Sequence, residues 1–304
     1  MKKAGLVLIL FLLIILTGCS ITEKFGFGKS VSTGRGVITK FIDAPPNNAK
    51  INEGDPFGFQ IEISNYVTGE TGVSGEICME DDLSENYGGI PSNACQSVDL
   101  PPATNINNRV TPTLDIFSFG TYEYRNLESS LSLGTGTRAK LNYEVSTTAG
   151  AVTCVRSKSA KIQGCGETKT LSVQQPDMPL KISTLVSKSI PLSDQEADVQ
   201  LEITLSKSIN GQLFTKGRDS NRQTGSAEID FDVTVDQLPA TCLLVSNNRV
   251  VIRQNEDQKV IKCHSRVSLN SDSINAPIII KIGYGFIQTI QGPALELRKE
   301  EAIA

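Results

Sequence analysis

Few side chains in this 304-residue sequence could carry chemistry, and the first to consider is the single histidine, His264. A Ser-His-Asp or Cys-His site would have to use it as the base. Strand alternation would place Lys262 and Arg266 beside it on one face. Two flanking cations disfavour a protonated ring, and no carboxylate stands close in the sequence to orient it. We therefore expect an exposed strand histidine, with a pH-sensing or ligand contact as the alternative, and predict that the chain is not an enzyme.

Carboxylates could serve hydrolysis or bind a cation without histidine. The densest acidic cluster consists of Glu80, Asp81, Asp82 and Glu85. Four carboxylates supply oxygen ligands suited to Ca²⁺, but their spacing does not match the D-x-[DN]-x-[DN]-G loop. We expect a solvated hairpin tip, with a weak Ca²⁺ or partner site as the alternative, and no other cofactor.

Seven cysteines are present, and setting Cys19 aside leaves an even number. The other six form three local couples, each around a turn-rich segment: Cys78 with Cys95, Cys154 with Cys165, and Cys242 with Cys263. No two are close enough for a C-x₂₋₄-C metal half-site. Closing loops of this length contributes about 3 kcal/mol each in the chain-entropy model. The couples predict three structural disulfides, rather than free buried thiols or a metal site, and an oxidising compartment.

The N-terminus carries Lys2 and Lys3 and then an apolar run of eleven residues at 6–16. That run has the length of a signal-peptide core and is too short to span a bilayer. The residues LTGC that end at Cys19 resemble the lipobox of prokaryotic lipoproteins. The resemblance implies a signal peptide at 1–18 and a lipid on Cys19, with an uncleaved anchor helix as the alternative. Residues 19–34, rich in Gly and Ser, are expected to form a flexible tether.

Composition narrows the class of protein further. The chain is 39% apolar and 20% charged, so it can bury a core. Its formal charge is −4, which argues against a nucleic-acid partner. Residues 134–138 (GTGTR) resemble a fragment of a phosphate loop but lack its lysine and its helix. We therefore expect a turn there.

Apolar residues alternate with polar ones in nearly every stretch after the tether. Clear examples are 57–63, 141–145, 199–205, 229–235 and 278–286. Period-two patterns separated by turn-forming residues indicate short antiparallel strands that are polar on one face. The predicted fold class is therefore all-β, in the form of β-sandwiches.

Three matches in the same order suggest an internal repeat. Residues 59–64 (FQIEIS) match 199–204 (VQLEIT), 74–80 (SGEICME) match 226–232 (SAEIDFD), and 141–143 (LNY) match 282–284 (IGY). Two prolines at 176 and 179 mark a boundary between the copies. We predict two tandem sandwiches, at 35–175 and 178–298, and expect the second to fold by itself.

The turn at 51–56 (INEGDP) before the strand at 57–64, with the late strands around Tyr143 and Tyr284, resembles the immunoglobulin-like modules of prokaryotic cell-surface proteins, including CARDB-type domains. The resemblance implies adhesion or envelope scaffolding. We expect a lipid-anchored extracytoplasmic structural or protein-binding surface module whose partners are the membrane and other envelope or surface proteins. The alternative is a sugar- or peptide-binding lipoprotein of an uptake system, although aromatic residues make up only 6% of the chain.

Overall fold

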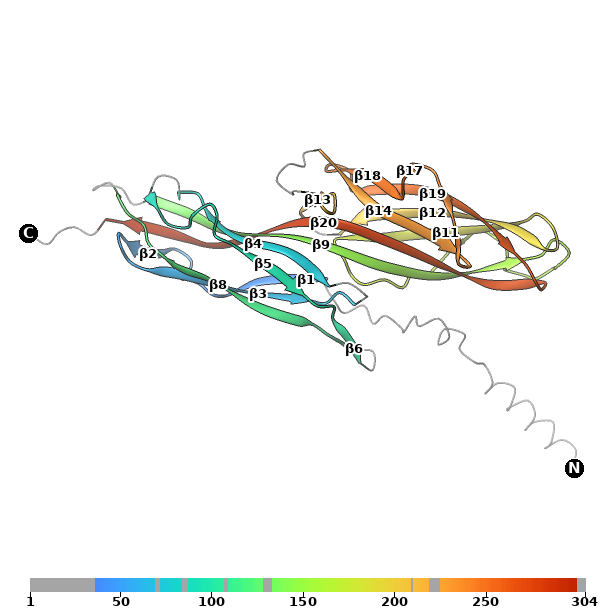
Figure 1. The fold of residues 1–304 in the computed structure, drawn as a ribbon, viewed down its shortest axis with the longest axis horizontal. Coiled ribbons are helices and arrows are strands. Elements are labelled where there is room, and N and C mark those ends of the chain that lie inside the picture. The colour runs from blue at the N-terminus through green and yellow to red at the C-terminus, as the bar shows by residue number, and fades with distance from the viewer. Residues whose placement is uncertain are drawn as a thin grey trace, which may run out of the picture.

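The computed structural model describes residues 36–68, 72–83, 87–106, 109–127, 133–208, 210–218 and 225–299. These residues form an all-β protein whose strands are mostly antiparallel, as the alternating sequence predicts. Figure 1 shows an elongated molecule in which two long strands run side by side along most of its length. The other strands are arranged around that pair.

The two long strands are β9 (Leu133–Arg156), with 24 residues, and β20 (Ser273–Arg298), with 26. They pair antiparallel almost end to end, from Arg156 opposite Ser273 to Leu133 opposite Leu297. At about 3.3 Å per residue, a strand of this length extends about 80 Å. Strands in globular proteins usually have 3–10 residues. The pair is therefore the long axis of the molecule.

The turn predicted at residues 134–138 is wrong. All five residues belong to β9, and each of Thr135 and Thr137 points its side chain into the buried face. Glycine is depleted in strands but not excluded from them. A long partner strand supplies the backbone hydrogen bonds that the local sequence does not signal.

One bulge interrupts the pairing, where Gly292 and Pro293 of β20 stand opposite Thr137 alone. Thr137 donates a hydrogen bond from Oγ1 to the Pro293 carbonyl oxygen at 2.7 Å. Proline has no N–H for the ladder, so a bulge is where a strand tolerates it. The extra residue moves the inward side chains of β20 from the even positions at 276–286 to Leu295 and Leu297.

These strands lie at the centre of a ten-stranded sheet. Its other members are β4 (Val73–Asp81) and β5 (Cys95–Leu100) on the β9 side, then β14 (Ser226–Val235), β18 (Arg249–Arg253) and β17 (Val245–Ser246) on the β20 side, with the short β2 (Ala49–Asn52), β13 (Gln212–Phe214) and β15 (Leu238–Pro239). Strand β4 pairs with the first half of β9, and β14 pairs with the first half of β20. Each flank therefore extends the sheet at a different end of the axis.

Two smaller sheets complete the fold. One has the order β1 (Val37–Asp43), β3 (Phe57–Asn65), β8 (Thr113–Tyr122), and the other has the order β10 (Lys169–Thr170), β11 (Leu180–Pro191), β12 (Glu196–Lys207), β19 (Gln258–Ser268), β16 (Thr241–Cys242). Strands β6 (Thr104–Ile106) and β7 (Arg109–Thr111) form a separate hairpin. In Figure 1 the first sheet lies toward the end of β20, and the second lies toward the opposite end.

Apolar side chains from all three sheets form one continuous buried cluster. The inward sets follow the alternation in the sequence, and Ile61, Ile203, Ile229 and Tyr284 are fully buried. Along β9 the odd-numbered side chains from Thr135 to Val155 are all buried. The same face of this strand therefore supports both smaller sheets.

The order of the strands agrees with the internal repeat. The sheet β1-β3-β8 corresponds to β11-β12-β19, and β5-β4-β9 corresponds to β18-β14-β20. The offset of 141 that relates the late strands makes Glu144 equivalent to Gly285, and these two residues are paired with each other. The equivalent strands β9 and β20 thus pair antiparallel, with the equivalent residues Glu144 and Gly285 at the centre of the pairing. Two copies related by a twofold axis would pair in the same way.

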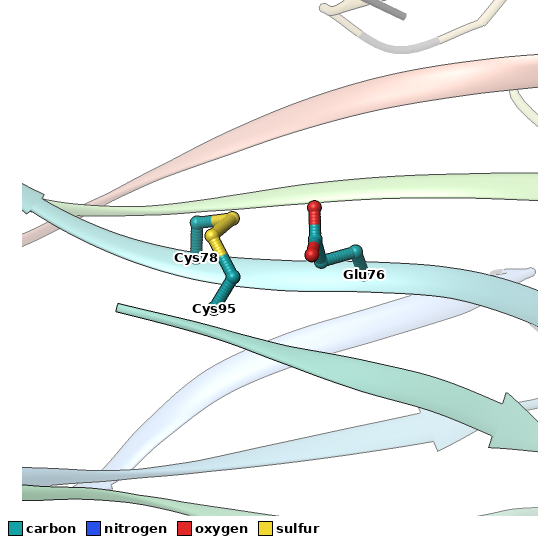
Figure 2. Close-up of side chains that lie close together, drawn as sticks. All are labelled: Glu76, Cys78 and Cys95. Atoms are coloured by element: carbon teal, nitrogen blue, oxygen red, sulfur yellow. A yellow bond between two sulfur atoms is a disulfide. The ribbon is translucent and has the colours of Figure 1, made fainter. Parts of the chain in front are cut away.

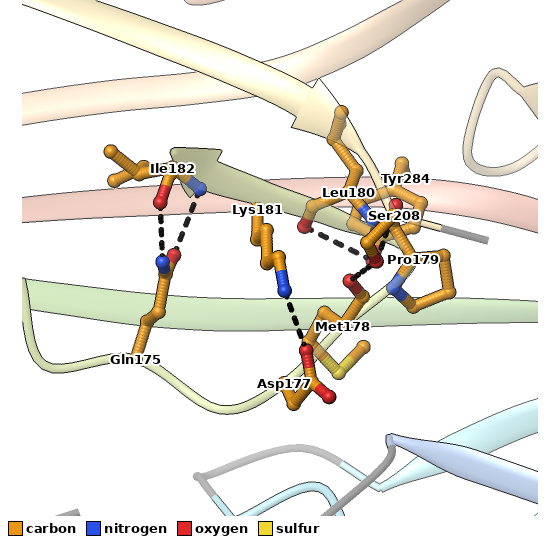
Figure 3. A network of polar contacts seen from close by, with 9 residues as sticks. All are labelled: Gln175, Asp177, Met178, Pro179, Leu180, Lys181, Ile182, Ser208 and Tyr284. Atoms are coloured by element: carbon orange, nitrogen blue, oxygen red, sulfur yellow. Dashed lines mark hydrogen bonds and ion pairs between the residues drawn. The ribbon is translucent and has the colours of Figure 1, made fainter. Parts of the chain in front are cut away.

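The segment that follows β10 passes this midpoint and is held by hydrogen bonds to Tyr284 of β20, to Ser208 just after β12, and within itself (Figure 3). The Leu180 N–H donates to the Tyr284 hydroxyl at 3.2 Å, and burial raises the pKa of Tyr284 above its ordinary value. Ser208 donates from Oγ to the Met178 carbonyl oxygen at 2.6 Å. Gln175 exchanges two hydrogen bonds with the backbone of Ile182, at 2.6 and 2.9 Å. The segment is thus part of the packed structure.

The first smaller sheet begins against the same segment. Gly36, just before β1, has φ of +60°, and a Cβ on it would lie 2.7 Å from the Asp177 carbonyl oxygen. Only glycine fits this combination of conformation and close approach. The two smaller sheets therefore meet near the middle of the molecule.

This arrangement differs from two independent tandem units divided at 176–179. Strand β9 lies in the first predicted range and β20 in the second, yet each is the partner of the other along its length. The end of β20 also pairs with β2, Leu295 opposite Ala49, and Thr153 of β9 meets Ser187 of β11 with 2.8 Å between their hydroxyl oxygens. Each half therefore completes the other, which argues against the expectation that the second half folds by itself.

A fragment of residues 178–298 should not fold as a monomer, because β20 would lose the hydrogen-bonded edge and the buried neighbours that β9 supplies. Circular dichroism and a thermal melt measure this, with the fragment refolded together with residues 36–175 as the matched control. A cooperative melt of the monomeric fragment would contradict the shared axis.

Candidate functional site

Three disulfides join the cysteines in the predicted couples, Cys78–Cys95, Cys154–Cys165 and Cys242–Cys263. The first and third connect residues that stand directly opposite each other on neighbouring strands, β4 with β5 and β16 with β19. Structural disulfides persist in oxidising compartments, so they indicate an extracytoplasmic environment. The predicted lipid-bearing residue, Cys19, lies outside the described residues.

One group of three potential metal ligands occurs in the described ranges, and it consists of Glu76, Cys78 and Cys95 (Figure 2). Cysteine binds a metal as its thiolate. Both sulfur atoms here are bonded to each other, so neither is a thiolate. Glu76 is then a single carboxylate beside a disulfide, and the group is not a metal site while that bond is intact.

Two of the predicted acidic residues flank one arginine. Glu80 accepts a hydrogen bond from Arg138 Nε at 2.9 Å, and Asp82 accepts one from Nη1 at 2.8 Å. The hydrogen bond with Glu80 is the main cause that raises the pKa of Arg138 above its ordinary value. The group is partly exposed, so its contribution to stability is small. The fourth acidic residue, Glu85, lies outside the described residues.

Asp81 has a different surrounding from its neighbours because it is buried. Its Oδ2 accepts hydrogen bonds from the Tyr124 hydroxyl at 2.8 Å and from the Ile90 N–H at 3.0 Å, and its Oδ1 accepts one from the Leu83 N–H at 2.9 Å. Burial, and then the charge of Asp81, raises the pKa of Tyr124 above its ordinary value. These contacts give the acidic residues a structural role, and Ca²⁺ binding remains a prediction.

His264 is exposed on β19, and its Nδ1 lies 3.5 Å from Oδ1 of Asp198. The residues next to His264 in the sequence include no carboxylate for this ring, because Asp198 comes from another strand. The register between β12 and β19 places Gln200 opposite His264 and so brings Asp198 to a diagonal position. The contact lies at the surface, so it contributes little to stability.

A shallow groove of about 400 Å³ covers the outer face of β11, β12 and β19 around this histidine. Its lining includes Val186, Glu202, Lys262 and the side chain of Leu243. The Lys262 ammonium lies 3.6 Å from the Glu202 carboxylate. The groove thus combines an apolar wall with the Lys262–Glu202 ion pair and the side chain of Lys188.

A second groove, of about 700 Å³, lies where β1 ends and the chain turns toward β2. Prolines and aromatic rings contribute to its lining, among them Pro45, Pro46, Phe57 and Phe119, and Lys50 is its cation. Of the two grooves, this one has the aromatic lining that a sugar or peptide site needs.

Comparisons with protein-family models, with curated proteins and with solved structures find no match for this chain. Within the described ranges, the structure contains no helix of the length and hydrophobicity that crossing a membrane requires.

The contacts of Asp81 predict the effect of removing it. Asp81→Ala would leave a buried hydroxyl and two N–H groups without an acceptor, and should lower the free energy of unfolding by about 3–5 kcal/mol. Asp82→Ala is the matched control, since that side chain is more than half exposed, and it should change stability little. Urea denaturation of both variants measures this, and equal effects would contradict the structural role of Asp81.

Proposed function

We propose that the chain is a lipid-anchored, extracytoplasmic surface module with a structural or protein-binding role and no catalytic activity. The observation that carries the proposal is the continuous pairing of β9 with β20, which joins both halves into one elongated body. A body built around strands of about 80 Å suits a spacer or scaffold better than an enzyme, which needs a converging site.

The anchor rests on the LTGC sequence that ends at Cys19, together with the charged start and the apolar run before it. A lipid anchor of this kind implies that the folded part lies outside the cytoplasm. The three disulfides support that location, because disulfides persist in an oxidising compartment. One acyl chain binds a membrane only marginally, so stable anchoring by this route implies more than one chain.

We infer that each half is an immunoglobulin-like sandwich of the CARDB-type kind. The support is the repeated order of strands, in which three strands of a smaller sheet cover three strands of the central sheet. Modules of this kind serve adhesion or scaffolding, so the proposed partners are other envelope or surface proteins.

A sugar- or peptide-binding lipoprotein of an uptake system is the second candidate. The groove between β1 and β2 favours it, because Phe57, Phe59 and Phe119 contribute to its lining. All three rings are nearly buried in the core, however, and present little surface to a ligand. The surface module is therefore the better supported function.

Cys19→Ser should abolish lipid attachment, because the thiol that accepts the lipid would be missing. Cells grown with a clickable fatty acid test this by the label on the purified protein. Ser20→Ala, which changes the neighbouring residue and keeps the thiol, should retain the label. Equal labelling of Cys19→Ser and the wild type would contradict the lipid anchor.

A further inference from the structure

We propose that the outer face of the β1-β3-β8 sheet lies against the lipid surface to which the chain is anchored, so that the elongated body lies along the membrane. The inference rests on the proposed lipid anchor. Its central element is an apolar patch, formed by Ile42, Leu114 and Ile116, which we call the β8 patch.

The point where the N-terminal segment joins the folded part supports this orientation. Gly36 lies against Asp177 and Met178, close to the midpoint of the β9–β20 pair. Figure 1 likewise shows β1 starting near the middle of the molecule. A lipid attached through this segment therefore holds the body near its centre.

The length of chain between the lipid and the body limits how far apart they can be. Seventeen residues, 19–35, separate the two, and even fully extended they span at most about 60 Å. The body extends about 40 Å to either side of its centre, so the length of the connection does not by itself fix the orientation. The connection does hold the surface around its entry point within about 60 Å of the lipid. An apolar surface next to that entry point is therefore the one best placed to contact the lipid.

The β8 patch is on that side. The first rows of the sheet place Ile38 beside Ser64 and Leu114, and then Lys40 beside Glu62 and Ile116. Ile38, which shares this first row with Leu114, is only two residues after Gly36. Neighbouring strands in the sheet lie about 4.8 Å apart, so Leu114 is close to Gly36. The patch begins where the connecting segment enters the fold.

The side chains of the β8 patch are open to contact. Leu114 is 57% exposed, Ile116 48% and Ile42 42%. On this face the Lys40 ammonium lies 2.8 Å from the Glu62 carboxylate. The exposed carboxylate of Asp43 lies next to Ile42, opposite Gln60. Exposed branched apolar side chains with a few charged groups beside them suit the boundary of headgroups and acyl chains.

The opposite face of the molecule offers a matched comparison. Val251 on β18 is exposed to the same extent as Ile116, 48%. It belongs to the outer face of the ten-stranded sheet, beside Arg249, which pairs with Glu228 at 3.0 Å and with Asp230 at 3.2 Å. This face should point away from the lipid.

The experiment uses the full lipidated protein in vesicles of phosphatidylcholine and phosphatidylglycerol. A fluorophore is attached at Ile116→Cys, at Leu114→Cys or at Val251→Cys, and quenching by nitroxide-labelled lipid is measured. We expect several-fold stronger quenching at positions 116 and 114 than at 251. The two patch positions are independent, so a folding defect in one leaves the other as a test.

Flotation of the same vesicles separates the two proposals. Protein that does not float with the lipid would overturn the anchor and the orientation together. Protein that floats but shows equal quenching at all three positions would overturn the orientation alone. Labels at 116 and 114 that are shielded from aqueous iodide without lipid quenching would also overturn it, because a second copy or another protein would then cover the patch.

Discussion

The pairing of β9 with β20 is the constraint on which the rest of the structure depends. The strands are equivalent in the two copies of the repeat, and they pair antiparallel about Glu144 and Gly285. Apart from the β6–β7 hairpin, the sheets among the described residues either extend this pair or pack on its buried face. Because hydrogen bonds run across the midpoint, neither half has a complete sheet without the other.

This constraint bears on function. A chain of two sandwiches joined by a flexible linker would bend between them. Here the shared pair of strands holds the halves in one orientation, together with contacts such as Thr153 with Ser187 and Lys216 with Ser146. The disulfides then fix strands and a loop at the periphery, where pairing is shorter. A rigid elongated body suits the proposed role as a surface spacer or protein-binding scaffold, and with the proposed lipid anchor its central attachment would give it a lipid-facing side.

Local pattern predicted much of this fold. Alternation identified the buried faces of β3, β12 and β14, and sequence proximity identified the three disulfides, because both depend on neighbours in the chain. The lengths of β9 and β20 were beyond such reasoning: Gly134 and Gly136 look like a turn, and only a distant partner strand makes them extended. For the same reason the contact between His264 and Asp198 could not be predicted, since it depends on the register between two strands.

The most direct test of the account is whether the two halves unfold as one unit. Ile61→Ala removes a fully buried side chain from the first half and should cost about 2–5 kcal/mol. Hydrogen exchange followed by mass spectrometry reports the two halves separately. With a shared axis, the core amides of β12 in the second half should lose protection together with those of β3. Loss of protection in β3 alone, with β12 unchanged, would show that the halves are independent and would contradict the account.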